Sequence, residues 1–427
     1  MKTLAIIAEY NPFHNGHLYQ LSEAKKIAGC DYSIALMSGN FLQRGEASFW
    51  SKYTRSHMAL LGGLDLVLVL PFCYATGSAH DFAYGAINLL NKLNSVDCLC
   101  FGAEHDDINT FYDISEIIIN EPSYYLDIMK SNLKKGYSFA RARSMAVADY
   151  MGNPDIMNIL EQSNNILALE YICALKESNS SIEPIIIKRK QANYNDKKIY
   201  NSISSATAIR HAINKSDISD SFDNIQNDIP ATTYELLSAA KDTTFPIYDS
   251  DLSNYIINAI LSRRSYYVNS KLYGDFTSIC DINSDINAKL NKLTFPLIYK
   301  DIIESLSGKQ YTKTRINRAL LHLILGYEAA HRTAFINAGY VFYANILGIN
   351  KSTTSYLKDI KGKSEIPVIT KKADFDSLIS VYDPEYQKLS SLMWGLDLAA
   401  SRLYNQIVCD KYGVVLQDDF NINLPVI

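Results

Sequence analysis

Residues 3–17 read TLAIIAEYNPFHNGH, and this stretch decides the fold. It begins with the apolar run Thr3–Ala8, which is typical of a strand buried on both faces. Asn11 and Pro12 then turn the chain, and a helical pattern follows from His17 to Ala28. This order predicts a strand, a tight turn and a helix, which is how a βαβ unit begins.

The same alternation continues through the first two hundred residues. Further strands are predicted at 32–37, 66–70, 98–101 and 184–188, and helices at 52–62, 81–93 and several places between 111 and 175. Strands that alternate with helices form parallel sheets. We therefore expect an α/β protein with a Rossmann-like, doubly wound parallel sheet.

The second half of the chain has a different pattern. Residues 217–230 are rich in Asp, Ser and Asn and end at Pro230, as in a linker or surface loop. Beyond them the periodicity is helical apart from a short strand near 366–370, with helices expected at 251–266, 296–307, 314–326 and 389–409. We predict two domains, one at 1–215 and a mostly α-helical one at 231–427.

Composition places the chain among folded cytosolic proteins. It has 427 residues, of which 48% are apolar and 20% charged, and a net charge of −4. Seven scattered Cys indicate reduced thiols, and Cys98 and Cys100 are expected to be buried on one strand face. The longest apolar run, 64–72, contains Asp65 and is too short to span a membrane, and we find no targeting segment.

Three local basic runs stand out in this acidic chain, at 188–198, 309–318 and 351–372. Because the distribution of charge matters more than its sum, they are compatible with a nucleic-acid partner. No protein partner is evident.

The turn after the first strand carries the residues with the clearest chemistry. Ligands of open α/β sheets sit at the carboxyl ends of the strands, Gly16 permits close backbone approach, and His17 opens a helix that attracts anions. Two imidazoles there could stabilise an α-phosphate during transfer. A chance pairing or half a metal site is the alternative, but no third ligand follows at helical spacing, so we expect no metal site.

A second polar element is Ile-Ser-Ser-Ala-Thr-Ala-Ile-Arg at 203–210. Ser204 and Ser205 are natural helix caps, and Arg210 follows about a turn and a half later. The element is either a simple capped helix or a grip on β- and γ-phosphates. Residues 37–46 form a long polar loop after the second predicted strand, which either covers the site or is a solvated connector.

The His-x-Gly-His and Ile-Ser-Ser-x-x-x-Ile-Arg patterns together resemble the nucleotidyltransferases related to class I aminoacyl-tRNA synthetases. Longer stretches at 9–17, 37–46, 101–104, 164–167 and 314–322 resemble one family among them, the tRNA(Met) cytidine acetate ligases. The resemblance implies that ATP and acetate form an acetyl-adenylate, whose acetyl group passes to N4 of the wobble cytidine of elongator tRNA(Met). Mg²⁺ is expected because it neutralises triphosphates.

The resemblance and the local chemistry assign three sets of residues. The catalytic set is His14, His17 and Arg210. The ATP-binding set is Ile7, Ala8, Glu9, Tyr10, Asn11, Pro12, Phe13, His14, Asn15, Gly16, His17, Leu18, Tyr19, Gln20, Gly102, Asn165, Arg189, Ser204 and Ser205. Two departures from the family pattern, at 190–196 and at Val69, leave those positions without a role.

The third set, Arg315, Arg318 and His322, is predicted to bind RNA. These residues fall on one face of a helix whose other face carries Ile316, Ala319, Leu320 and Leu323. Such a basic stripe can follow a phosphate backbone, although solvated charge is the alternative. Two rival functions remain open, a cofactor-making adenylyltransferase and a non-catalytic RNA-binding protein that holds ATP.

Overall fold

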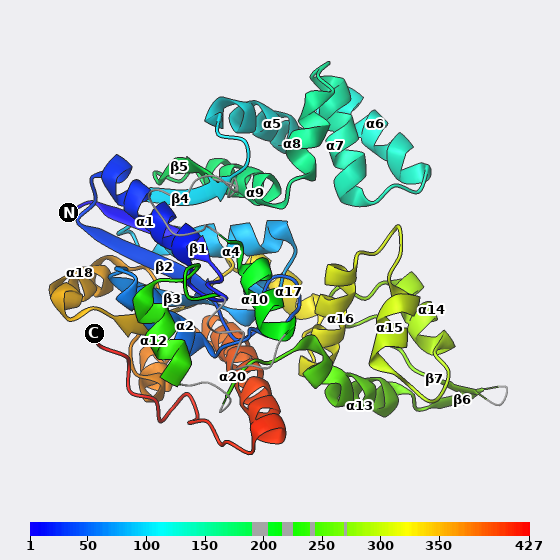
Figure 1. Ribbon diagram of the computed structural model, residues 1–427. Coiled ribbons are helices and arrows are strands. Elements are labelled where there is room, and N and C mark those ends of the chain that lie inside the picture. Colours follow the sequence, from blue (N-terminus) through cyan, green and yellow to red (C-terminus); the bar gives the residue numbers. More distant parts are fainter. Residues whose placement is uncertain (190–203, 216–224, 240–243, 269–270) are drawn as a thin grey trace.

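The computed structural model describes residues 1–189, 204–215, 225–239, 244–268 and 271–427. Its centre is a seven-stranded sheet in the order β5-β4-β1-β2-β3-β8-β9 (Figure 1). The strands are β1 Thr3–Ala8, β2 Tyr32–Ser38, β3 Leu66–Leu70, β4 Cys98–Ala103, β5 Glu183–Lys188, β8 Ala344–Ile349 and β9 Val368–Ile369. All neighbours are parallel except β3 and β8, which are antiparallel, and the predicted Rossmann-like sheet is confirmed.

The strand order reverses at β1, because the chain proceeds from β1 to β2 and β3 on one side and to β4 and β5 on the other. In such sheets the crevice at the carboxyl ends beside the reversal point is where ligands bind. Residues 9–17 leave β1 at this crevice, which is the position that the sequence predicts for the site.

Helices cover both faces of the sheet and separate two apolar cores. Alternate residues of β1 enter different cores, with Leu4 and Ile6 on one face and Ala5 and Ile7 on the other. Cys98 and Cys100 are buried on the same face, as predicted, and all seven thiols are free. The covering helices are α1 Asn15–Ala28, α2 Lys52–Leu61, α10 Ala206–Lys215 and α12 Ala231–Ala239 on the first face, and α4 Ala79–Lys92 and α9 Ser163–Glu177 on the second.

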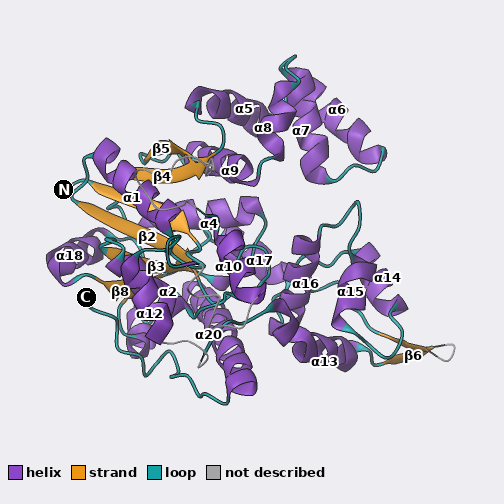
Figure 2. Cartoon of the chain, viewed as in Figure 1, coloured by secondary structure: helices purple, strands orange, loops and turns teal. Residues whose placement is uncertain are grey.

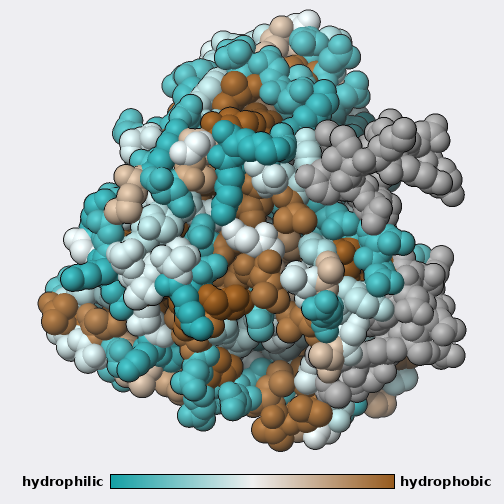
Figure 3. Space-filling model, turned by 60° about the vertical axis from the view of Figure 1, so that its left-hand side comes forward, coloured by the Kyte–Doolittle hydropathy of each residue, from teal (hydrophilic) through white to brown (hydrophobic). Residues whose placement is uncertain are grey.

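Two helical lobes extend from the same side of this body (Figure 2). The first lobe is inserted between β4 and α9 and contains α5 Ile108–Asn120, α6 Ser123–Lys134, α7 Phe139–Tyr150 and α8 Asp155–Glu161. The second contains α13 Ser253–Arg263, the hairpin β6 Tyr266–Val268 and β7 Lys271–Tyr273, α14 Ser284–Lys292, α15 Tyr299–Leu306, α16 Lys313–Leu325 and α17 Ala329–Asn337. In Figure 3 the top of the molecule, which the first lobe forms, is largely hydrophilic, whereas hydrophobic residues gather lower on that face.

The chain returns to the sheet after the second lobe. Strands β8 and β9 complete the sheet edge, and α18 Thr354–Lys363 and α20 Pro384–Tyr412 pack on the body. The remaining short elements are α3 Phe72–Ala75, α19 Phe375–Ile379, η1 Asp249–Leu252, η2 Lys351–Thr353 and η3 Lys372–Asp374. The division into 1–215 and 231–427 stays a prediction, but the region beyond residue 230 contributes strands as well as helices, and the expected strand near 366–370 is β9.

The loop after β2 is firmly structured rather than a solvated connector. The buried Arg55 of α2 donates hydrogen bonds to four backbone carbonyls around it, those of Glu9, Ser38, Gly39 and Trp50. At its far end Gly45 has φ +71°, and a Cβ added there would lie 2.3 Å from the backbone nitrogen of Arg318 on α16. The loop therefore joins the rim of the sheet directly to the second lobe.

Within the described residues, no helix is long and apolar enough to cross a membrane.

We expect Gly45→Ala to destabilise the protein by about 2 kcal/mol more than Gly152→Ala. Gly152 also has a positive φ, +61°, but has no atom within 4 Å of an added Cβ, so it measures the backbone strain alone. The excess reflects overpacking against the α16 backbone. Urea unfolding of both variants measures this difference in the free energy of unfolding. Equal losses of stability in the two variants would show that the added methyl group at residue 45 does not clash with α16.

Candidate active site

The two histidines of the first turn face each other at the start of α1. His14 is the N-cap, and its Nδ1 accepts a hydrogen bond from the Gly16 backbone N–H at 3.0 Å. The His14 backbone N–H in turn donates to Nδ1 of His17 at 3.3 Å, and the two rings stack with centroids 3.7 Å apart. Because each Nδ1 accepts a hydrogen bond, this network assigns the proton of each neutral ring to Nε2.

Both imidazoles are held neutral. Burial, with Arg189 and Arg210 nearby, lowers the pKa of His14 to about 3. Burial, with His14 and Arg189, also lowers the pKa of His17 well below its usual range. Each ring therefore presents an uncharged Nε2–H donor at a helix N-terminus, where backbone N–H groups also favour anions.

Arg210 comes to this turn from a distant part of the sequence. Its guanidinium donates to the Asn11 carbonyl at 2.8 Å and to Thr207 Oγ1 at 3.3 Å, and it lies 5.8 Å from the ring centroid of Phe49. Ser205 caps α10 by accepting from the Ala208 backbone N–H at 3.2 Å, while Ser204 is half-buried beside it. The His-x-Gly-His turn and Arg210 of the Ile-Ser-Ser-x-x-x-Ile-Arg pattern are therefore in direct contact.

Several other residues of 7–20 hold the turn in place through packing and hydrogen bonds. Tyr10 and Phe13 place their rings 4.8 and 5.7 Å from that of His17. Asn15 donates through its backbone N–H to the Asp228 carbonyl and through Nδ2 to the Asn227 carbonyl. Ile7 and Ala8 end β1, and Leu18, Tyr19 and Gln20 follow in the first turns of α1.

Glu9 is a half-buried carboxylate at the start of the turn, directly after β1. Its Oε1 accepts from the Gln43 backbone N–H at 2.9 Å. Burial raises the pKa of Glu9, against the opposing effect of this hydrogen bond and of Arg210, Arg55 and Arg44. The sequence analysis did not identify Arg55, although an Arg among the apolar positions of a predicted helix was a usable signal.

Gly102, Asn165 and Arg189 lie at the rim formed by the carboxyl end of β4, and Gly102 is within that strand. Arg189 lies over Gly102, where an added Cβ would be 3.3 Å from the Arg189 Cγ, and its guanidinium remains partly exposed. Asn165 accepts through Oδ1 from the backbone N–H groups of Glu104 and His105 and donates through Nδ2 to the Ile159 carbonyl. Asn165 therefore fixes the chain after β4, and its polar atoms are already engaged. The departure at 190–196 lies outside the described residues.

The predicted basic stripe on α16 lies largely inside the protein, and its RNA-binding role stays a prediction. His322 is only 1% exposed and bonds with Thr76 Oγ1 at 3.1 Å, and the Arg318 Nε contacts Asp281 Oδ2 at 3.1 Å. Although burial opposes ionisation, Arg318 and His322 hold the pKa of Asp281 below its usual range. This half-buried carboxylate draws both side chains inward, so of the three only the Arg315 side chain, 36% exposed, remains accessible from outside.

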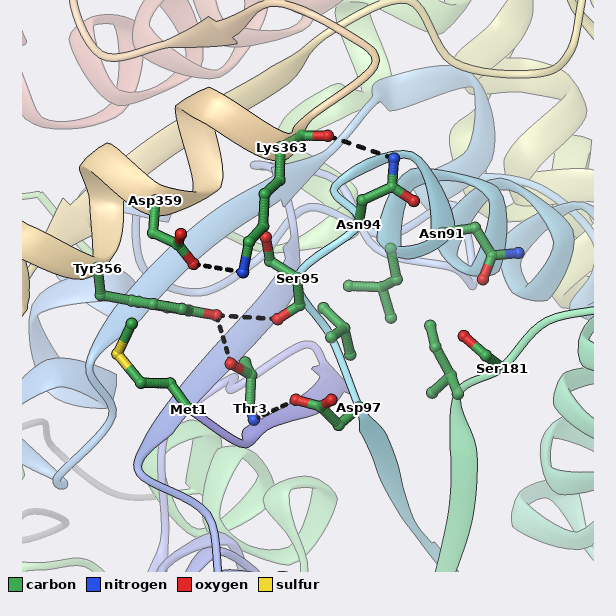
Figure 4. A pocket seen from close by; sticks show the side chains of 13 residues that line it. Met1, Thr3, Asn91, Asn94, Ser95, Asp97, Ser181, Tyr356, Asp359 and Lys363 are labelled. Atoms are coloured by element: carbon green, nitrogen blue, oxygen red, sulfur yellow. Dashed lines mark hydrogen bonds and ion pairs between the residues drawn. The ribbon is translucent and has the colours of Figure 1, made fainter.

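A polar cavity of about 210 Å³ lies at the opposite, amino end of the strands (Figure 4). Its polar groups bond to one another: Tyr356 donates to Thr3 Oγ1 at 2.8 Å, and Lys363 pairs with Asp359 at 2.8 Å. It is remote from the switch-point crevice, and its contacts tie α18 to the start of β1. We assign it a structural role.

Comparison with known proteins agrees with this geometry. The family model described as HIGH Nucleotidyl Transferase matches residues 1–417. A tRNA(Met) cytidine acetate ligase from Caldanaerobacter subterraneus subsp. tengcongensis is 39% identical over 406 residues, covering 95% of each chain. One from Clostridium perfringens is 40% identical over 395 residues, covering 89% of this chain and 92% of that one.

A solved structure is similar over its whole length. Thermotoga maritima TmcAL bound with alpha-thio ATP superposes with a TM-score of 0.88 at 29% identity, covering 100% of this chain and 99% of that one. The fold, the stacked histidines and these relatives lead to one assignment. The chain belongs to the HIGH nucleotidyl transferase family and, within it, to the tRNA(Met) cytidine acetate ligases.

Proposed function

We propose that the protein uses ATP to activate acetate as acetyl-adenylate and then acetylates N4 of the wobble cytidine of elongator tRNA(Met). The observation that carries the proposal is the pair of stacked, neutral imidazoles at the start of α1, with Arg210 bound to the same turn. The names of the relatives and the ATP analogue in the T. maritima structure support it.

The first step forms a bond between an acetate oxygen and the α-phosphorus and breaks the bond to the bridging oxygen, so pyrophosphate leaves. His14 and His17 donate Nε2–H groups to the non-bridging oxygens, whose negative charge is concentrated in the transition state. Arg210, together with the Ser205-capped start of α10 and Ser204, holds the departing phosphates, and Arg189 offers charge from the rim. In the second step the cytidine amine attacks the acetyl carbonyl, AMP leaves and the amine loses a proton.

Mg²⁺ fits this scheme as a companion of the triphosphate. Within the described ranges no group of three or more His, Cys, Asp or Glu side chains is arranged to hold a metal ion. The nearby Glu9 carboxylate already accepts from Gln43. We infer that the phosphates would supply most of the ligands of the ion.

We also propose a cytosolic location, which suits both the free thiols and a tRNA substrate.

The two rival functions are less well supported. A cofactor-making adenylyltransferase would share the histidines but would not need both helical lobes, whereas relatives named for tRNA match almost the whole chain. A non-catalytic ATP-holding protein would not need His14, His17 and Arg210 gathered at one turn.

We expect His17→Ala to lower acetate-dependent exchange of pyrophosphate into ATP at least 100-fold. The loss removes one transition-state donor, worth about 3 kcal/mol. His211→Ala is the control, because His211 is exposed on the neighbouring α10. A near-wild-type exchange rate in a folded His17→Ala protein would contradict the assigned role.

We expect ATP to yield AMP and pyrophosphate when acetate and tRNA are present. The histidines address the α-phosphate, and the sequence has no Gly-x-x-x-x-Gly-Lys-Ser/Thr loop for γ-phosphoryl transfer. Chromatography of α-labelled and γ-labelled ATP identifies the products. ADP as the main product would reject the mechanism.

The neutral histidines also predict a pH dependence of stability. With a folded pKa of about 3 and an ordinary value of 6.5, His14 takes up its proton only on unfolding between these pH values. Acidification therefore destabilises the fold, by about 1 kcal/mol for this residue between pH 6.5 and 5.5. Denaturant unfolding at both pH values should show a drop smaller by that amount in His14→Gln, and identical drops would contradict a neutral, buried His14.

A further inference from the structure

The corner between α6 and α7, residues 130–143, carries a concentrated positive charge. It contains Lys130, Lys134, Lys135, Arg141 and Arg143, and no acidic residue occurs between Asp127 and Asp149. The chain as a whole has a net charge of −4. A local field of this sign in an acidic protein favours an anionic partner.

Most of these cations are not neutralised by the protein. Arg143 is engaged, because its Nη1 lies 2.7 Å from the buried Glu170. Lys130, Lys134, Lys135 and Arg141 are exposed and form no ion pair with any acidic side chain that the structure describes. Four charges are thus available at one corner.

Aromatic rings are exposed among these cations. Phe139 is 59% and Tyr137 39% exposed, and the Arg141 guanidinium lies 5.7 Å from the Tyr137 ring centroid. Gly136, with φ +85°, makes the turn that separates the lysines from the rings. Exposed rings next to free cations are the combination that binds unpaired nucleotides, because rings stack on bases while cations meet phosphates.

The corner is connected to the candidate active site through the base of its lobe. The lobe leaves the sheet at Ala103, the last residue of β4, and returns through α9. Asn165 at the start of α9 holds the backbone of Glu104 and His105, which closes the base of the lobe at the rim occupied by Arg189. An RNA on the corner is therefore held by an element anchored at the crevice where the reacting base must enter.

We propose that the α6–α7 corner is an RNA-binding surface, in which Lys134, Lys135 and Arg141 contact phosphates and Tyr137 and Phe139 stack on unpaired bases. The inference rests on the proposed function, since a tRNA anticodon loop supplies both phosphates and unpaired bases. An acidic protein would be matched by the charges, but it would leave the two rings unexplained.

The test compares three double variants. Lys134→Glu/Lys135→Glu should lower tRNA affinity at least tenfold at 0.1 M salt and reduce the slope of log affinity against log salt by about 1.4 to 1.8. Tyr137→Ala/Phe139→Ala should lower affinity about tenfold with an unchanged slope, because stacking releases no counterions. Lys2→Glu/Lys388→Glu makes the same charge change on two exposed lysines outside the three basic runs and should leave binding unchanged.

Acetate-dependent pyrophosphate exchange without tRNA separates this inference from the proposed function. All three variants should keep the wild-type exchange rate. If the wild-type protein itself shows neither pyrophosphate exchange nor tRNA binding, the proposed function is refuted. Wild-type tRNA affinity and salt slope in the lysine and aromatic variants would overturn the inference alone. If a thermal melt shows that a glutamate variant is unfolded, Lys134→Ala/Lys135→Ala replaces it, with the same flattening of the slope expected.

Discussion

Two backbone N–H groups at the start of α1 have imidazole nitrogens as their acceptors, and the chemistry of the site depends on this constraint. A helix N-terminus always leaves backbone donors without helical partners, and a Ser or Asp cap would satisfy them equally well. Here Gly16 donates to His14, and His14 donates to His17. The helix thereby orients both rings and sets their tautomers, so the same contacts that begin the helix also fix the two Nε2–H donors to which we assign phosphate binding.

Burial and the nearby arginines keep both histidine rings uncharged. Arg210 and Arg189 lower the pKa of His14 together with burial, so the positive charge of the site resides on guanidinium groups, which remain ionised. The buried Arg55 draws the backbone of the first turn and the loop after β2 into one unit. That loop then reaches α16 at Gly45, which connects the crevice at the carboxyl ends of the strands to the second lobe without an intervening side chain.

The sequence predicts the sheet and the first turn well because both follow from short-range patterns. The strand Thr3–Ala8, the helix after it and the burial of Cys98 and Cys100 need only periodicity and turn chemistry. Residue periodicity also placed Arg318 and His322 correctly on one helical face, but it could not reveal that Asp281 lies against that face. Asn165 shows the same limit, since its role depends on the backbone of residues 104 and 105 rather than on its neighbours in sequence. Contacts between distant segments carry no signal in local periodicity.

The antiparallel pairing of β3 with β8 has a consequence for the order in which the chain is made. Leu66 pairs with Ile349, so the edge of β3 has no partner until most of the polypeptide has left the ribosome. An unpaired apolar strand edge is a template for association with other chains. Long-range pairings of this kind also form slowly, because the intervening chain must first be ordered. The nascent protein therefore passes through a long period in which the wholly apolar strand β3 needs shielding, either by a chaperone or by the helices that are already folded on its faces.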